Sequence, residues 1–181
     1  MTRTLWTVGH STHDWDAFVA LLRDAGIAAV ADVRRYPGSR RHPQYAAEAM
    51  ARELPRAEIS YEPIPELGGR RPARPDSPST GWRNAGFRGY ADYMATPGYA
   101  IGRERLETLA AAVPTAVMCA EVLWWQCHRG LIADDFKARG WEVLHLQPGG
   151  RSQAHPWTGP ARIVDGRLDY SAPADDQRTL F

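Results

Sequence analysis

The chain alternates short apolar runs with helical patterns, and this alternation constrains its fold more than any other feature. Ile27–Val33 and Thr115–Cys119 are short and almost continuously apolar, which is typical of strands buried on both faces of a parallel sheet. Apolar residues recur at helical spacing across Asp14–Ala25, a stretch that ends at Gly26. Further strands are expected at 5–9, 59–64 and 141–146, and further helices at 43–54, 90–95, 99–112 and 131–139. The pattern predicts an α/β fold, a compact three-layer sandwich with a largely parallel sheet.

The length of 181 residues suits one domain with a substantial core and is short for two. We expect a single domain over residues 1–181, with a core at 5–147 and a C-terminal extension at 148–181. Within the extension, Ala161–Tyr170 contains an Asp-Gly turn signal and predicts a small hairpin. Asp175–Phe181 is expected to be a loose tail.

The composition is that of a soluble globular protein, with 44% hydrophobic and 24% charged residues. No apolar run is long enough to span a membrane, and the first residues, Met1-Thr-Arg-Thr-Leu-Trp6, contain no apolar signal region. Two cysteines in such a chain favour free thiols over a disulfide framework. We therefore expect a cytoplasmic location and no membrane partner; the sequence does not identify protein partners.

Basic residues are distributed unevenly, although the net charge is only +1. All basic residues but Lys137 are arginines, which codon bias in a GC-rich genome would also explain. Between Arg34 and Arg88, however, the sequence contains eleven arginines and only six acidic residues. Because arginine binds phosphate and carboxylate groups bidentately, this excess predicts an anionic partner, either a small molecule or a nucleic acid. The long loop at Leu67–Gly86, with Trp82 inside it, is available to close over such a ligand or to stack on a base.

One segment directly after a buried strand concentrates reactive side chains. It contains Cys119, Glu121, Cys127, His128 and Arg129, and thus two thiols, a carboxylate, an imidazole and a guanidinium. In parallel sheets, ligands bind beyond the carboxyl ends of the strands. The polar residues that follow the other strands should therefore meet this segment at one edge of the sheet.

These residues are assigned to two roles. The predicted catalytic residues are Glu121 as general acid–base, Cys127 or Cys119 as nucleophile, and Asp32 orienting His10 or an arginine. The predicted substrate-binding residues are Ser11, Arg34, Arg35, Arg40, His128 and Arg129. Arg40 belongs to a basic cluster after a turn, for which a solvated loop is the alternative. Ser11 lies before a helix, where a capping role is the alternative to anion binding.

Each chemical role has a structural alternative. Cys119 ends a buried strand, where an unreactive core cysteine is common. Cys127 is expected just before a helix and next to two basic residues, which would lower the pKa of its thiol. Partial burial of Glu121 beside two tryptophans would raise the pKa of its carboxyl, whereas a salt bridge to Arg129 or Arg34 is the alternative. Asp32 ends a buried strand and therefore requires a basic partner.

No resident cofactor is predicted. The alternative is zinc, for which Cys119, Cys127, His128 and His10 are four plausible ligands. The spacing between the two cysteines differs, however, from that of the usual structural zinc pairs.

Several segments together carry a family resemblance. They are Thr7-Val-Gly-His-Ser11, Ala31-Asp-Val-Arg34 with Pro37, Ser39 and Arg40, Leu67-Gly-Gly69, Tyr93-Met94, Met118-Cys-Ala-Glu121 and Cys127-His-Arg129. In this order, from Leu5 to Leu146, the chain resembles the family described as domain of unknown function 488. The resemblance implies a compact α/β domain whose cysteines have been suspected of an enzymatic or metal-binding role, and it supplies no settled reaction.

The sequence thus predicts an intracellular enzyme that performs hydrolysis or group transfer on an anionic substrate resembling a nucleotide or nucleic acid. It contains no Gly-x-Gly-x-x-Gly, Walker or Gly-x-Ser-x-Gly motif, and this argues against dinucleotide-binding, P-loop and α/β-hydrolase sites. Two alternatives stay open. One is a non-enzymatic nucleic-acid-binding module, and the other is a metal-binding or redox-sensing protein.

Overall fold

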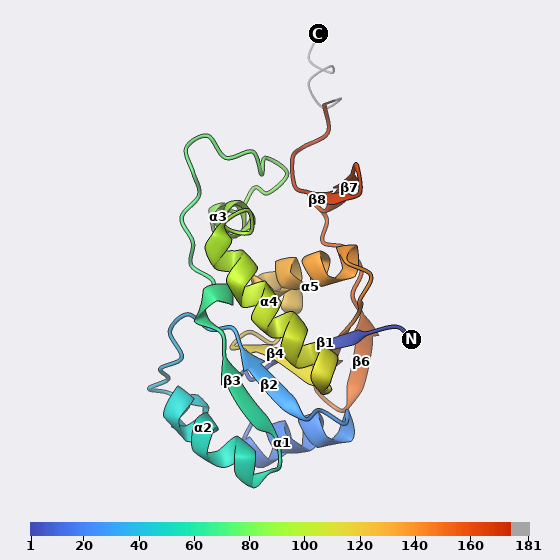
Figure 1. Cartoon of the computed structure of the whole chain (residues 1–181). Helices are drawn as coiled ribbons and strands as arrows, with labels where there is room; N and C mark the ends of the chain where they lie inside the picture. Colours follow the sequence, from blue (N-terminus) through green and yellow to red (C-terminus); the bar gives the residue numbers. More distant parts are fainter. Residues whose placement is uncertain (175–181) are drawn as a thin grey trace.

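The computed structural model describes residues 1–174, and the predicted tail Asp175–Phe181 lies outside the described residues. It confirms the α/β fold with a mostly parallel sheet (Figure 1). The six-stranded sheet has the order β3-β2-β4-β1-β5-β6, and only β6 runs antiparallel to its neighbour. The strands are β1 (Thr4–Gly9), β2 (Ala29–Asp32), β3 (Ser60–Pro63), β4 (Thr115–Cys119), β5 (Glu142–Gln147) and β6 (Arg151–Ala154).

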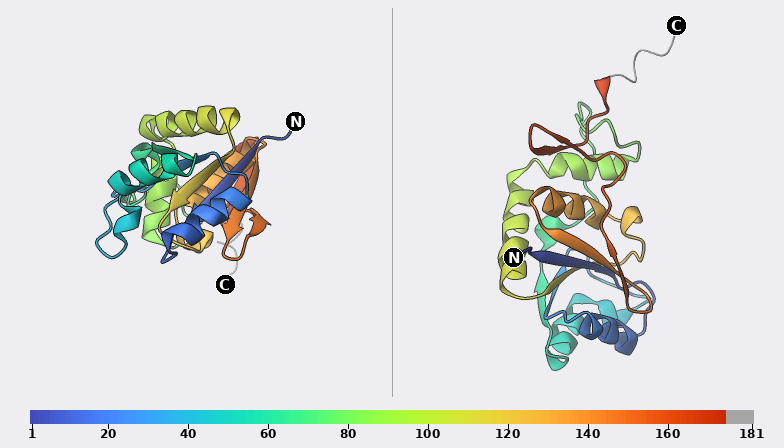
Figure 2. Two further views of the ribbon diagram at one scale, coloured as in Figure 1. Left: turned by 90° about the horizontal axis from the view of Figure 1, so that it is seen from below. Right: turned by 90° about the vertical axis from the view of Figure 1, so that its right-hand side faces the viewer.

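Helices cover both faces of the sheet (Figures 1 and 2). One layer contains α1 (Trp15–Asp24) and α2 (Ala47–Arg56), and the other contains α4 (Pro97–Ala112) and α5 (Arg129–Ala138). α3 (Ala85–Tyr93) lies beside α4 and α5, near the hairpin of β7 (Arg162–Val164) and β8 (Arg167–Asp169). Short 3-10 turns occupy Pro43–Tyr45, Pro65–Leu67 and Trp124–Gln126.

The sheet separates two hydrophobic cores, as its continuous apolar strands require. All residues of β2 and β4 are buried. Side chains alternate along β4, so that Ala116 and Met118 pack in the core with α1 and α2, whereas Val117 and Cys119 pack in the core with α4 and α5. A strand buried on both faces cannot show a polar alternation, which explains its uniform composition. Cys119 therefore belongs to the α5 side of the molecule.

Three details of the predicted elements were wrong. Residues 43–54 do not form one helix: the chain is extended at Ala46, between the 3-10 turn and α2. α3 begins at Ala85, five residues earlier than predicted, because the Asn84 side chain accepts hydrogen bonds from the N–H groups of Gly86 and Phe87. β6 was not predicted, since all four of its residues are exposed and polar or small.

The C-terminal hairpin was predicted correctly. Asp165 and Gly166 have φ angles of 51° and 73°, the left-handed conformation that a two-residue hairpin turn requires. Among residues 1–174, no helix combines the length and the apolar character needed to cross a membrane.

Candidate active site

The candidate site is at the carboxyl ends of β1, β2 and β4. The segment after β1 lies against the segment after β4, because the N–H groups of His10 and Ser11 donate to the carbonyls of Cys119 and Ala120 at 3.0 and 2.9 Å. Gly9 permits this contact: a Cβ there would come within 1.8 Å of the Glu121 carbonyl oxygen. Parallel strands thus bring residues more than one hundred positions apart to one edge, as predicted.

Asp32, Arg34 and His10 form one hydrogen-bonded group. Arg34 donates from Nε and Nη2 to the two carboxylate oxygens of Asp32, at 2.9 and 2.7 Å, and Tyr61 donates its hydroxyl to the same carboxylate at 2.6 Å. The Arg34 Nη1 lies 3.3 Å from the His10 Nε2. His10 also stacks on Tyr45, and burial with the nearby Arg34 lowers the pKa of His10 to about 4. Asp32 therefore has the basic partner that its burial requires, and His10 is a neutral acceptor.

The two cysteines form a buried pair of free thiols. Their sulfurs are 2.8 Å apart. Burial and the hydrogen bond to Cys127 raise the pKa of the Cys119 thiol well above its usual range. Burial alone would raise the pKa of Cys127 too, but the hydrogen bond with Cys119, the Arg129 cation and the Arg129 backbone N–H lower it overall. Cys127 is therefore the thiol that ionises first. While protonated it donates to the Cys119 sulfur, and once it is a thiolate Cys119 becomes the donor.

Arg129 is a buried cation at the start of α5. Its side chain is almost inaccessible to solvent, with 1% exposure. Nη2 donates to the carbonyls of Glu121 and Val122, at 2.9 and 2.6 Å, and these bonds hold the loop that follows β4. Among residues 1–174, Nε and Nη1 have no hydrogen-bond partner, and no carboxylate forms an ion pair with this guanidinium.

His128 faces Cys127 in a defined tautomer. Its Nε2 lies 3.1 Å from the Val33 carbonyl oxygen, which can only accept, so this nitrogen carries the proton. Nδ1 is left as an acceptor, 3.5 Å from the Cys127 sulfur. Burial lowers the pKa of His128, which keeps the ring neutral. Gly69 allows the ring its position, because a Cβ there would lie 2.8 Å from Nδ1.

A cavity of about 200 Å³ joins these groups. Six of the residues selected from the sequence line it, namely Arg34, Arg35, Cys119, Glu121, Cys127 and His128. Four further residues, Tyr36, Gly69, Arg70 and Ala120, line it without having been assigned a role in the sequence. The Arg35 guanidinium donates to the Arg70 carbonyl at 2.9 Å, which fixes the loop after β3 against the loop after β2.

Five other selected residues do not line this cavity. His10, Asp32 and Arg129 lie behind it and contact the lining residues. Ser11 has a positive φ of 46° and does not cap α1, whose cap is Asp14. Arg40 is exposed in the loop after β2, as a solvated residue would be.

The surroundings of Glu121 differ from those predicted from the sequence. Its side chain is exposed rather than partly buried beside the two tryptophans. Its carboxylate forms no ion pair with Arg129 or Arg34; Arg129 binds the backbone carbonyl of Glu121, and Arg34 binds Asp32. Glu121 is therefore open to solvent, while its backbone carbonyl is held by the buried Arg129.

Cys127 also lines a second, aromatic cavity of about 140 Å³. Its walls contain five aromatic side chains, those of Trp82, Phe87, Trp124, Trp125 and Trp157. The loop residue Trp82 packs on Phe87 with ring centroids 5.0 Å apart. Cys127 therefore separates an arginine-rich cavity from an aromatic one.

A buried chain of hydrogen bonds behind Trp124 was not predicted. Asp134 binds His155, His155 binds His145, and His145 binds Thr7, with distances of 2.8, 2.8 and 2.6 Å. No sequence pattern indicated a role for His155, because its partners come from β1, β5 and α5. This network ties the C-terminal segment to the core, and it borders the aromatic cavity through Thr158, which donates to Asp134.

A metal site is not assembled from the four residues considered as zinc ligands. No group of three or more His, Cys, Asp or Glu side chains able to hold a metal ion is found in residues 1–174. The His10 ring faces Arg34 and Tyr45 rather than the thiols.

Fold and site together define an α/β protein with a buried dithiol at the carboxyl edge of a mostly parallel sheet. The chain belongs to the family described as Domain of unknown function DUF488, whose model matches residues 14–136. The matched region includes β2, β4, both cysteines and Arg129. No curated protein and no solved structure matches the chain.

Proposed function

We propose that this protein is a cysteine-dependent enzyme in which the Cys127 thiolate attacks a small anionic substrate. The observation that carries the proposal is the buried Arg129 guanidinium beside a thiol of lowered pKa. A buried cation without an anionic partner costs several kcal/mol (on the order of 3–5 kcal/mol when a pair is broken). The thiolate of Cys127 is the nearby anion that offsets this cost.

The position of Cys127 adds to this effect. It lies two residues before α5, a helix of 10 residues with His128 at its N-cap, and the backbone N–H of Arg129 at the first position of α5 helps to lower the pKa of its thiol. Helix N-termini stabilise anions and lower thiol pKa values. Cys119 and the neutral His128 complete the surroundings of the sulfur, one as a donor and the other as an acceptor for the thiol proton.

The substrate is proposed to carry an anionic group and a planar ring. Arg35 and Arg70 line the first cavity beside Arg34, which is paired with Asp32, and free guanidinium groups of this kind bind phosphate or carboxylate. The aromatic cavity on the other side of Cys127 suits a flat ring, which tryptophans bind by stacking. A nucleotide-like molecule has both features.

The proposed reaction is hydrolysis or group transfer. The Cys127 sulfur forms a bond to an electrophilic centre of the substrate, and the bond to the leaving group breaks. Glu121, a residue of the same cavity, takes up the proton that the Cys127 thiol releases and passes it to the leaving group. Water or an acceptor, deprotonated by the resulting carboxylate, then releases the product from sulfur.

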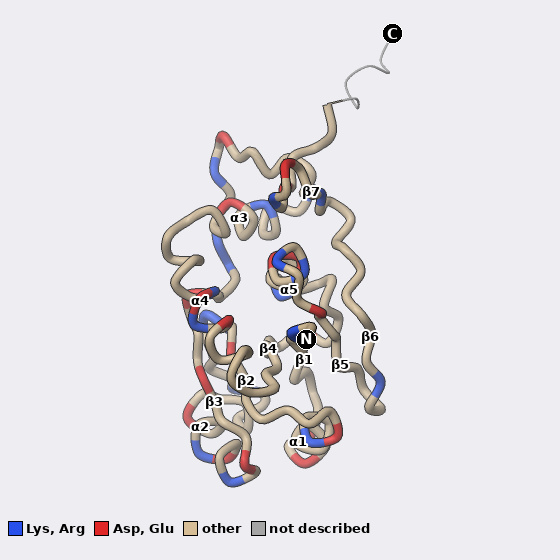
Figure 3. The backbone as a smooth tube through the Cα atoms, turned by 45° about the vertical axis from the view of Figure 1, so that its right-hand side comes forward, with Lys and Arg blue, Asp and Glu red and all other residues tan. Residues whose placement is uncertain are grey.

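The charge distribution favours a small anion over a long nucleic acid. Several arginines of the basic stretch 34–88 are already paired with carboxylates: Arg34 with Asp32, Arg52 and Arg56 with Glu53, and Arg74 with Asp76. Basic and acidic residues are interspersed along the backbone in Figure 3. A nucleic-acid-binding module requires a basic face. A free dithiol also suits a reducing compartment, and we propose a cytoplasmic location for this reason.

Alkylation of the thiols tests the proposal. Iodoacetamide should modify Cys127 well below pH 8 and much faster than Cys119, with peptide mass spectrometry separating the two. The Cys119→Ser variant isolates Cys127, and the Cys127→Ser variant isolates Cys119 as the matched control. Equal and slow modification of both thiols, accelerated only by denaturant, would show two inert core cysteines.

A second candidate function, redox sensing, is favoured by the distance of 2.8 Å between the sulfurs. Hydrogen peroxide would oxidise the Cys127 thiolate to a sulfenic acid, and the Cys119 sulfur would then displace hydroxide to form a disulfide with loss of water. Intact-mass analysis after brief peroxide treatment should show the loss of two hydrogens. Overoxidation to a sulfinic acid without a disulfide would contradict this function.

A further inference from the structure

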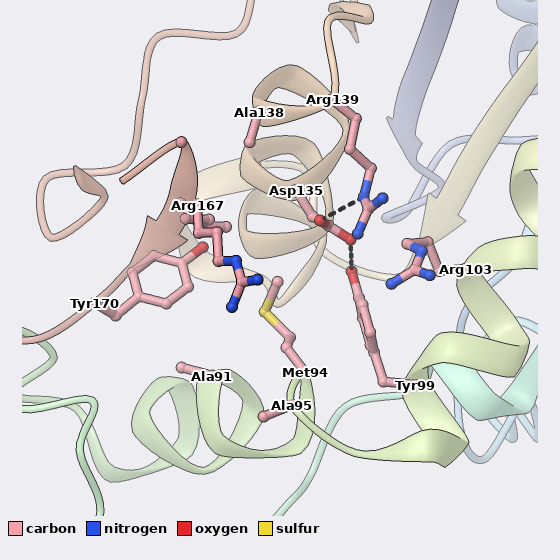
Figure 4. A pocket seen from close by; sticks show the side chains of 12 residues that line it. Ala91, Met94, Ala95, Tyr99, Arg103, Asp135, Ala138, Arg139, Arg167 and Tyr170 are labelled. Carbon is pink, nitrogen blue, oxygen red and sulfur yellow. Dashed lines mark hydrogen bonds and ion pairs between the residues drawn. The ribbon is translucent and has the colours of Figure 1, made fainter. Parts of the chain in front are cut away.

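A larger cavity is lined by residues other than those around the thiols. Its volume is about 460 Å³, and its lining residues come from α3, α4, α5, β8 and the residues next to them (Figure 4). Small-molecule sites commonly have volumes of roughly 300–1,000 Å³. None of its lining residues lines either cavity at Cys127. It is therefore a separate feature of the fold.

Three arginines from different elements meet in this cavity. Arg103 comes from α4, Arg139 follows α5, and Arg167 begins β8. Their positions in the sequence are far apart and show no common motif, so only the folded chain brings them together. Figure 4 shows Arg103 and Arg167 on opposite sides of Met94.

The single carboxylate that lines the cavity is already bound. Asp135 accepts from the Arg139 Nε at 2.9 Å and from the Tyr99 hydroxyl at 2.8 Å. Arg139 is thereby neutralised. Arg103 and Arg167 keep their charge, and the structure of residues 1–174 contains no hydrogen-bonded carboxylate for either of them.

Arg103 is the more constrained of these two cations. Its side chain is only 18% exposed, and its nearest carboxylate, Glu104, is 3.8 Å away and mostly in solvent. Its Nε is buried and has no hydrogen-bond partner among the described residues. A buried guanidinium N–H without a hydrogen-bond partner destabilises the folded protein, and a bound anion would offset this loss.

We propose that this cavity binds a small organic anion, whose carboxylate or phosphate is attracted by Arg103 and Arg167. The apolar part of the ligand contacts Ala91, Met94, Ala95 and Leu168, which form the apolar lining. Binding joins β8 to α4 and holds the hairpin on the helices. This site does not depend on the function proposed for Cys127.

Titration calorimetry with phenyl phosphate and with benzoate tests the site, and benzyl alcohol serves as the uncharged probe. At least one anion should bind saturably, and the two anions show which group the arginines select. Arg167→Gln should weaken binding about tenfold or more, because it removes a charge-assisted hydrogen bond from an exposed side chain that folding does not need.

Two controls distinguish binding in this cavity from binding elsewhere on the protein. Arg52→Gln makes the same change on α2, at the opposite end of the molecule in Figure 1, and should leave binding unchanged. Cys127→Ser should also leave it unchanged, which distinguishes this cavity from the thiol site. Binding that does not saturate, or that Arg52→Gln weakens as much as Arg167→Gln, would overturn the proposal.

Discussion

At the scale of single residues, the site depends on the unequal pKa values of its two thiols. The pKa of Cys127 is lowered and that of Cys119 is raised, although the sulfurs are neighbours. Sequence indicated the difference in part, since Cys127 precedes a helix and adjoins basic residues. It did not indicate that Cys119 is the donor, because that depends on the packing of β4 against α5.

Replacing Cys119 by alanine should raise the pKa of Cys127. The change removes the hydrogen bond that favours the thiolate and leaves Arg129 in place. Thiolate absorbance followed against pH should show a higher midpoint for Cys119→Ala than for the unchanged protein. An unchanged midpoint would assign the stabilisation of the thiolate to Arg129 and the helix alone.

His10 should make stability depend on pH below neutrality. Burial lowers its folded pKa to about 4 from the usual 6.5, so the unfolded chain binds a proton before the folded protein does. The contribution of His10 is therefore full above pH 6.5 and is lost as pH falls toward 4, by up to about 3 kcal/mol.

Urea unfolding at several pH values measures this contribution. His10→Gln removes the titrating group and should show a smaller loss of unfolding free energy between pH 6.5 and 4 than the unchanged protein. Buried His128 and His145 contribute with the same sign, so the difference between the two proteins is the quantity that matters. Identical slopes would mean that His10 does not remain neutral in the folded protein.

At the scale of elements, the buried strands were the most predictable part of the fold. β2 and β4 are recognisable because burial on both faces demands a continuous apolar run. β6 could not be predicted from the sequence, since an exposed edge strand needs no apolar residue. The start of α3 was not predicted because glycines weaken the helical pattern of its first residues. Gly89 is required there because a Cβ would come within 2.0 Å of the Arg71 carbonyl oxygen.

Gly9→Ala tests the contact between the segments that follow β1 and β4. The new Cβ would meet the Glu121 carbonyl oxygen at 1.8 Å, so one of the two segments must move. We expect a loss of about 1–3 kcal/mol in the free energy of unfolding and slower alkylation of Cys127. Gly38→Ala is the matched control, because a Cβ there meets nothing within 4 Å. Equal effects of both changes would contradict the close contact.

At the scale of the whole molecule, sequence predicted the edge of the sheet at which the candidate residues converge, but only part of the cavity. The ends of β1, β2 and β4 converge because parallel strands share an edge. Arg70 was not assigned a role, since it reaches the cavity through a loop held by Arg35. Loop geometry also set the exposure of Glu121 and removed Arg40 from the site. Neither outcome follows from periodicity.

Salt dependence of oligonucleotide binding separates an enzyme for small anions from a nucleic-acid-binding module. Three arginines around a cavity of about 200 Å³ can contact few phosphates. The slope of log affinity against log salt should therefore be shallow, since each contact with a single strand contributes about −0.7.

Arg35→Gln should weaken binding of a nucleotide-sized anion, whereas Glu121→Gln should leave binding nearly intact and abolish turnover, because a carboxylate opposes an anion but transfers its proton. A slope equivalent to six or more phosphates, unchanged by Arg35→Gln, would instead make the protein a nucleic-acid-binding module.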